Sequence, residues 1–160
     1  MEELLIYRQR LLDRYADIAA EMGQFSASIP QEDRAATECE GWSLHKTLAH
    51  LRDVEAGYFQ PLYRRLLSGE DAPAGRYELQ AWERQDYDPN EPLETILADL
   101  ARLHRQEADT LRGLEPQGWN RACRHPVWGE RTLQWWVEQS LAHSTQHLRQ
   151  LRACFAGVVV

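Results

Sequence analysis

The sequence predicts a single all-α domain over residues 1–160, a four-helix bundle with a long connection between its second and third helices. Four stretches carry apolar residues at three- and four-residue spacing, which is typical of amphipathic helices. Segments containing Gly and Pro separate them, and no alternation of apolar and polar residues is long enough to indicate a useful strand. The length of 160 residues suits one domain with a sizeable core.

The predicted helices span Glu2 to Gln24, Ser43 to Leu67, Pro92 to Leu111 and Thr132 to Phe155. Ser43 is expected to cap the second helix, because its hydroxyl can accept an unpaired backbone N–H. Pro61 lies inside this helix and is expected to kink or split it. Residues 70–90 are rich in turn formers and are expected to carry a short helix around Tyr77 to Arg84. Residues 119–130 read as an irregular stretch.

Charge and hydropathy exclude two classes of partner. The net charge of −7, with no dense Lys/Arg cluster, disfavours nucleic acid. No apolar run approaches the roughly 20 residues that span a bilayer. Glu2 and Glu3 stand where a signal peptide would carry base, so we expect no membrane anchor and a cytoplasmic location.

The three cysteines, Cys39, Cys123 and Cys154, are odd in number and form no CxxC pair. This usage suits a reducing compartment and argues against a disulfide framework or a cysteine-rich zinc site. We expect all three to be small buried or half-buried residues.

Two histidines four residues apart carry the strongest chemical signal. His143 and His147 lie one turn apart on a fairly apolar face of the fourth helix, so both imidazoles can reach one ion. A buried imidazole pair without a partner would be costly, and a metal removes that cost. His50 lies on the inward stripe of the second helix and is the better third ligand. The alternative is that these are core histidines satisfied by polar neighbours.

The other histidines are expected to do less. His45 lies five residues from His50, about 140° around the helix axis, and is expected at the surface. His104 could be a fourth ligand or a base behind the ligands, but is expected to be partly exposed. His125, before Pro126, is expected to shape a turn or line the mouth of a pocket.

Acidic and aromatic residues complete the set of candidates. Asp53 lies one turn from His50, near its face, and is the candidate for a catalytic base. Glu55 and Glu138 lie about 140° from the histidine stripes and are expected at the surface. Aromatic side chains are expected either to wall a pocket or to pack in the core: Tyr58, Tyr77, Trp82, Trp128, Trp135 and Trp136.

Several short motifs follow one another in a specific order along most of the chain: Gly41-Trp42-Ser43, His50-Leu51, Trp119, His125-Pro126, Trp128-Gly129, Thr132-Leu133, His143 and His147-Leu148. Together they resemble the signatures of the DinB/YfiT-like superfamily. The resemblance implies an up-up-down-down four-helix bundle, often dimeric, with nickel, zinc or iron on three histidines that map to His50, His143 and His147. Many relatives carry Asp directly after the first histidine of the last helix, where this chain has Ser144.

The resemblance also implies a function class. Members include metal-dependent hydrolases and transferases or isomerases that use a low-molecular-weight thiol, such as bacillithiol, mycothiol or glutathione. We therefore expect an enzyme acting on a small electrophilic substrate, working as a homodimer without nucleic acid or membrane. The alternatives are a non-enzymatic metal- or small-ligand-binding protein of stress or detoxification, and a structural bundle whose histidines only pack.

Overall fold

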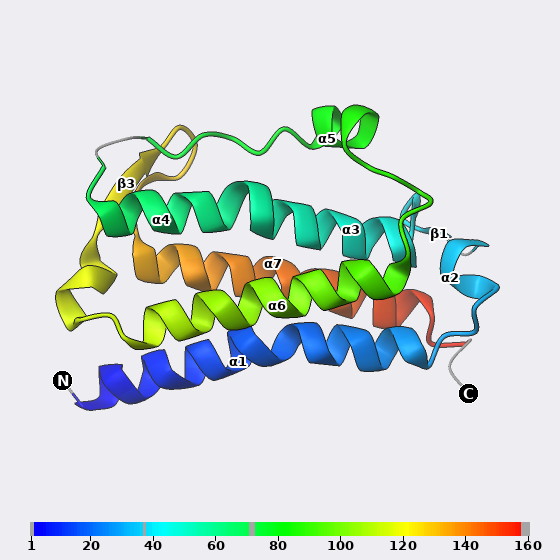
Figure 1. Ribbon diagram of the computed structural model, residues 1–160, viewed down its shortest axis with the longest axis horizontal. Helices are drawn as coiled ribbons and strands as arrows, with labels where there is room; N and C mark the ends of the chain where they lie inside the picture. Colours follow the sequence, from blue (N-terminus) through cyan, green and yellow to red (C-terminus); the bar gives the residue numbers. More distant parts are fainter. Residues whose placement is uncertain (1, 37, 71–72, 158–160) are drawn as a thin grey trace.

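The computed structural model describes residues 2–36, 38–70 and 73–157, and its long helices form the predicted four-helix bundle (Figure 1). The bundle elements are α1 (Glu2–Ala27), α3 (Leu44–Val54) continued by η1 (Glu55–Phe59) and α4 (Gln60–Ser68), α6 (Leu93–Arg112) and α7 (Leu133–Cys154). Helix α1 packs along α6. None of the described helices combines the length and the apolar character that crossing a membrane requires.

The helix directions differ from the order that the resemblance implied. Helices α1 and α7 run in one direction, and α3–α4 and α6 run in the other, so the order is up-down-down-up (Figure 1). The long connection after α4 explains this order. It runs back along the whole bundle before α6 begins, which allows the second and third bundle helices to lie parallel.

The second bundle helix is distorted, but not split, next to Pro61. Ser43 caps α3 by accepting the backbone N–H of Lys46 at 3.1 Å. Pro61 has no N–H to donate, and just before it the helix widens into the π-helical turn η1, where the Gln60 N–H bonds the Glu55 carbonyl. Helix α4 ends at Gly69, whose φ of 79° is a left-handed conformation that glycine adopts readily.

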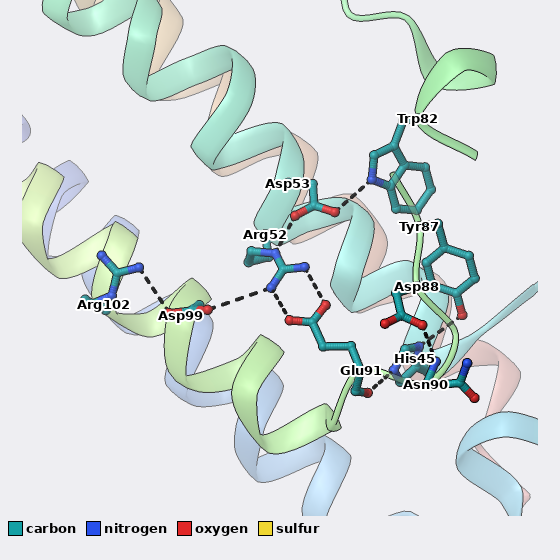
Figure 2. A network of polar contacts seen from close by, with 10 residues as sticks. All are labelled: His45, Arg52, Asp53, Trp82, Tyr87, Asp88, Asn90, Glu91, Asp99 and Arg102. Atoms are coloured by element: carbon teal, nitrogen blue, oxygen red, sulfur yellow. Dashed lines mark hydrogen bonds and ion pairs between the residues drawn. The ribbon is translucent and has the colours of Figure 1, made fainter. Parts of the chain in front are cut away.

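The connection between α4 and α6 carries α5 (Leu79–Gln85), close to the predicted short helix. A polar network centred on Arg52 of α3 fastens the end of this connection (Figure 2). The Arg52 guanidinium binds both carboxylate oxygens of Glu91 at 2.7 Å and also pairs with Asp53. Two-pronged pairs of this kind hold their partners in one orientation. The Asp53 carboxylate in turn accepts the indole N–H of Trp82 at 2.8 Å.

Short elements that the sequence did not predict close the two ends of the bundle. They are α2 (Asp33–Ala36), β1 (Glu38–Cys39), β2 (Trp42–Ser43), the 3-10 turn η2 (Pro116–Asn120), β3 (Ala122–His125) and β4 (Gly129–Thr132). Strands β1 and β2 pair antiparallel, as do β3 and β4. The stretch expected to be irregular is therefore largely a hairpin. Strands of two to four residues are too short to produce a readable alternation.

Two cysteines depart from the sequence expectation. Cys39 of β1 and Cys154 at the end of α7 are joined in a disulfide, with their Cα atoms 5.8 Å apart. Cys123 is free and buried, as expected. The spacing along the chain could not indicate this pair, because 115 residues separate the two cysteines and only the fold brings them together.

The core forms two buried clusters, one towards each end of the bundle. The larger fully buried side chains include Tyr15, Ile18, Met22, Leu48, Tyr63 and Trp136. His50 and His143 lie along α3 and α7 between residues of the two clusters. The metal-site candidates are therefore carried by two long helices that the core holds in place on both sides.

Candidate metal centre

The structure brings the three predicted histidines together. His50 projects from α3, and His143 and His147 project from successive turns of α7. The Nε2 atom of His143 lies 3.3 Å from that of His50 and 3.2 Å from that of His147. One ligand atom from each of the three residues lies within 4.8 Å of the others. The i,i+4 spacing on α7 is what places two of the rings over one point.

The three imidazoles are electrostatically prepared to act as neutral ligands. Burial, and after it the neighbouring His143 and His147, lower the pKa of His50 to about 3. Burial, then His147, lowers the pKa of His143 to about 4, and burial also lowers the pKa of His147. All three rings are therefore neutral near pH 7 and have a nitrogen lone pair to offer.

The atom separations fit a metal ion. Ligand nitrogens about 2.1 Å from one ion at tetrahedral angles lie about 3.4 Å apart. The observed separations of 3.3 Å and 3.2 Å are close to this value. Without an ion, two Nε2 atoms this close would need a proton between them to form a hydrogen bond. With an ion, both can be unprotonated and direct their lone pairs at it. The donor set of three neutral imidazoles is one that suits zinc, nickel and iron.

Aromatic rings surround the histidines. Trp82 lies 5.2 Å and Tyr77 5.6 Å from the His50 ring, measured between ring centroids. The Trp42 ring lies parallel to that of His147 and makes a T-shaped contact with that of His50. The contact of Trp42 with the histidines was missed by sequence reasoning, because the unpredicted β1–β2 hairpin is what brings it there.

The other expected wall residues separate into two groups. Tyr58 and Trp128 line a cavity beside the site. Trp136 is fully buried in the core, and its neighbour Trp135 is half-buried. Adjacent residues of a helix point about 100° apart, so the two could not both face the same cavity.

Two cavities of about 300 Å³ each border the histidines. The first is lined by Tyr58, Tyr77, His125 and Trp128 together with His50 and His143. The second touches all three histidines and is also lined by Cys39, Trp42 and Gln150. Each volume lies at the small end of the range for small-molecule sites. The histidine cluster thus stands between two chambers of small-molecule size.

Asp53 does not make a described hydrogen bond to any histidine. Its carboxylate pairs with Arg52 and accepts the Trp82 indole N–H, as Figure 2 shows. The His50 Nδ1 atom is buried and has no hydrogen-bond partner within the described part of the chain. The Asp53 carboxylate is therefore bonded to Trp82, whose ring packs against His50, and its role as a catalytic base stays a prediction.

Glu55 and His104 are buried, against expectation. The Glu55 side chain is 2% exposed and accepts hydrogen bonds from Tyr15 and, at 2.7 Å, from Ser140. His104 is fully buried, donates from Nδ1 to the Tyr15 carbonyl at 2.8 Å, and lies 3.7 Å from Glu55. The 140° offset of Glu55 from His50 directs it into the bundle, because α1 and α6 cover that side of the helix. Glu138, by contrast, is partly exposed and accepts the Tyr7 hydroxyl.

His45 and His125 have structural roles that their hydrogen bonds define. His45 is half-buried, not at the surface, and bonds the Tyr87 hydroxyl at 3.0 Å and the Glu91 carbonyl at 2.7 Å. His125 does what was expected of it. Its Nδ1 accepts the backbone N–H of Val127 and Trp128 within its turn, and its ring lines the first cavity.

A family model described as DinB superfamily matches residues 9–151. The chain belongs to the DinB superfamily. A relative from Oceanobacillus iheyensis, which carries the provisional name metal-dependent hydrolase, is 28% identical over 113 residues. That match covers 66% of this chain and 64% of the relative's own length.

The fold is shared with a solved structure. YfiT from Bacillus subtilis, described as a probable metal-dependent hydrolase with an unusual four-helix bundle topology, superposes with a TM-score of 0.83 at 19% identity. The superposition covers 94% of this chain and 86% of YfiT. At this identity the likeness establishes the four-helix-bundle fold alone, and the chemistry has to be argued from the site itself.

Proposed function

We propose that the protein is a metal-dependent hydrolase that holds one divalent ion on His50, His143 and His147. The observation that carries the proposal is the convergence of the three Nε2 atoms: the two that flank His143 lie at separations close to those of ligands on one ion, and all three residues have a ligand atom within 4.8 Å of the others. The names given to the Oceanobacillus relative and to YfiT describe the same class of chemistry. Nickel, zinc and iron all suit this donor set.

The surroundings support catalysis over storage. Three neutral ligands leave a coordination position open, whereas a structural site fills all of its positions with protein ligands. When bound, such an ion lowers the pKa of a coordinated water or thiol and so supplies a nucleophile at neutral pH. The first cavity gives a small electrophile a place beside His50 and His143, and its aromatic walls offer that electrophile apolar contacts. A protein that only sequesters an ion needs no such chamber.

A thiol-dependent transferase is the second candidate, and the second cavity favours it. This cavity borders all three histidines from the side of Trp42 and Gln150, separately from the first. A transfer reaction needs room for two reactants, whereas hydrolysis needs room for one reactant and water. The two cavities would hold a low-molecular-weight thiol and its electrophilic partner on either side of the histidines.

Elemental analysis of the purified protein tests the metal site. We expect close to one divalent ion per chain, and a marked loss in both His50→Ala and His147→Ala. The matched control is His45→Ala, which removes a half-buried histidine of the same helix α3 outside the cluster. A parent protein that holds no ion even after reloading with nickel, zinc and iron would contradict the proposal.

A second assay separates the two activities. The loaded protein is incubated with a small activated ester, and with a small electrophile in the presence and absence of glutathione. Ester hydrolysis that His147→Ala abolishes supports the hydrolase, and thiol conjugation that the same variant abolishes supports the transferase. A loaded protein that does neither over a broad panel would favour the non-enzymatic alternative.

A further inference from the structure

The first cavity has an unusual charge for this protein. The chain carries a net charge of −7, yet no Asp or Glu is among the described residues that line this cavity. Among the described lining residues Arg76 alone has a permanent charge, and the histidines in the wall have lowered pKa values. A pocket with one cation, no acid and aromatic walls attracts an anion that also has an apolar body.

The Arg76 guanidinium is available to a ligand. Arg76 is exposed and makes no hydrogen bond or ion pair with any part of the chain that the structure describes. Its backbone is nevertheless held in place. The Gly75 carbonyl accepts the Tyr58 hydroxyl at 2.8 Å, and the Ala74 N–H donates to the Arg124 carbonyl at 2.9 Å. The segment therefore presents Arg76 at the cavity from a fixed backbone.

His125 offers a second donor to the same cavity. The backbone N–H groups of Val127 and Trp128 both donate to its Nδ1, at 3.1 Å and 3.2 Å. Because Nδ1 is thus an acceptor, the proton of the neutral ring is assigned to Nε2. Burial lowers the pKa of His125, and the charge of Arg76 lowers it further, so the neutral ring predominates. Arg76 and His125 line the same cavity. No described residue accepts the Nε2–H.

We propose that Arg76 and the His125 Nε2–H form a carboxylate-binding subsite of the first cavity, and that the substrate is a small, largely apolar acid. The proposal rests on the function proposed above, because it specifies what enters the cavity beside the histidine cluster. A guanidinium recognises a carboxylate with two parallel hydrogen bonds, and a ring N–H can add a third. The aromatic walls bind the apolar body.

Binding of phenylacetate and of its neutral counterpart phenylacetamide tests the subsite. Both are titrated calorimetrically into the metal-free and the metal-loaded protein. The two probes have nearly the same shape, so the ratio of their affinities reports the charge. In both forms of the parent we expect phenylacetate to bind about tenfold more tightly, in line with a charge-assisted hydrogen bond, and the preference to weaken as salt is added.

Three variants assign the preference to residues. Arg76→Gln is expected to bring the affinity ratio close to one. His125→Asn retains an acceptor near the Nδ1 position but loses the Nε2–H, and is expected to reduce the ratio in part. Arg124→Gln is the matched control, since Arg124 is an exposed residue next to His125 on β3 and does not line the cavity. It removes the same charge and is expected to leave the ratio unchanged.

The outcomes separate this proposal from the metal site. A parent that binds the two probes equally or undetectably, or a ratio that Arg124→Gln lowers as much as Arg76→Gln, would overturn the subsite. A preference that appears only in the loaded protein and survives Arg76→Gln would mean that the metal binds the carboxylate; the subsite would then be wrong and the metal site right. A preference that depends on Arg76 in a protein that holds no metal would preserve the subsite alone.

Discussion

At the scale of single residues, one carboxylate connects all four bundle helices. Glu55 accepts hydrogen bonds from Tyr15 of α1 and Ser140 of α7, and lies 3.7 Å from His104 of α6. A buried charge without partners costs several kcal/mol. The hydrogen bonds from Tyr15 and Ser140 therefore stabilise the bundle by offsetting the cost of burying Glu55. Ser140 also lies one turn before His143 on α7, which connects this interior cluster to the metal-site candidates.

Removing one donor from this cluster should be measurable. We expect Ser140→Ala to lower the free energy of unfolding by about 1.5–3 kcal/mol, the usual range for a hydrogen bond to a charged group. Ser144→Ala is the control, because Ser144 is also buried on α7 but makes no described side-chain hydrogen bond. Urea denaturation of both variants measures the difference. Equal stability of the two would show that the bond from Ser140 to Glu55 contributes nothing.

The residues that sequence reasoning found and missed differ in how local their signals are. His143 and His147 can be recognised from the sequence alone, because a spacing of four on one helix places two side chains together whatever the tertiary structure is. Glu55 and Trp42 could not be placed in this way. Their positions depend on which helix covers the far side of α3 and on a hairpin of two-residue strands. Arg76 carries no motif, and its significance appears only once the cavity has formed.

At the scale of elements, periodicity predicted the long helices to within a few residues, and the irregularity expected at Pro61 takes the form of a π-helical turn just before it in a continuous helix. Amphipathic patterns of 20 residues repeat the same signal many times, so chance cannot easily imitate them. Strands of two to four residues show their alternation of apolar and polar residues only once or twice, which chance can produce. The order of helix directions was also beyond local signals, because it depends on the path that the connection takes after Gly69.

The Cys39–Cys154 disulfide, which joins β1 to the end of α7, should contribute measurably to stability. A disulfide that closes a loop of more than 100 residues restricts the unfolded chain strongly, and typically contributes about 2–4 kcal/mol. Reductant should therefore destabilise the parent by this amount and have no effect on Cys39→Ser. Alkylation of the unfolded, unreduced parent should label Cys123 alone. Labelling of all three cysteines would show that the bond does not form.

At the scale of the whole molecule, the proposed metal site lowers the stability of the metal-free fold in acid, because its histidines are buried in the neutral form. Three imidazoles from two helices must stay neutral and close together without a carboxylate among them. The homodimer that the resemblance implies stays a prediction. The start of α1 exposes the apolar side chains of Leu4, Leu5, Ile6 and Tyr7, each at least 43% accessible, which a second subunit would cover.

The cost of the histidine cluster should appear in the pH dependence of stability. The folded-state pKa values of about 3 for His50 and about 4 for His143 lie below the value of about 6.5 expected in the unfolded chain. The unfolded state therefore binds more protons in acid, so stability is fully present above pH 6.5 and is lost as the pH falls towards these values. For each histidine the loss should reach about 2 kcal/mol near pH 5.

Metal-free protein, variants and added metal together test this argument. Glu107, whose pKa burial raises to about 7, acts in the opposite direction, since its contribution is lost as the pH rises through that value. Denaturation is therefore measured in a Glu107→Gln background, where His143→Asn should flatten the acid limb and the control His45→Asn should not. At neutral pH, metal at about 100 times its dissociation constant should add about 2.7 kcal/mol, because it binds only the folded site. An acid limb that His143→Asn leaves unchanged would mean that other groups control the stability in acid, even if the metal binds as proposed.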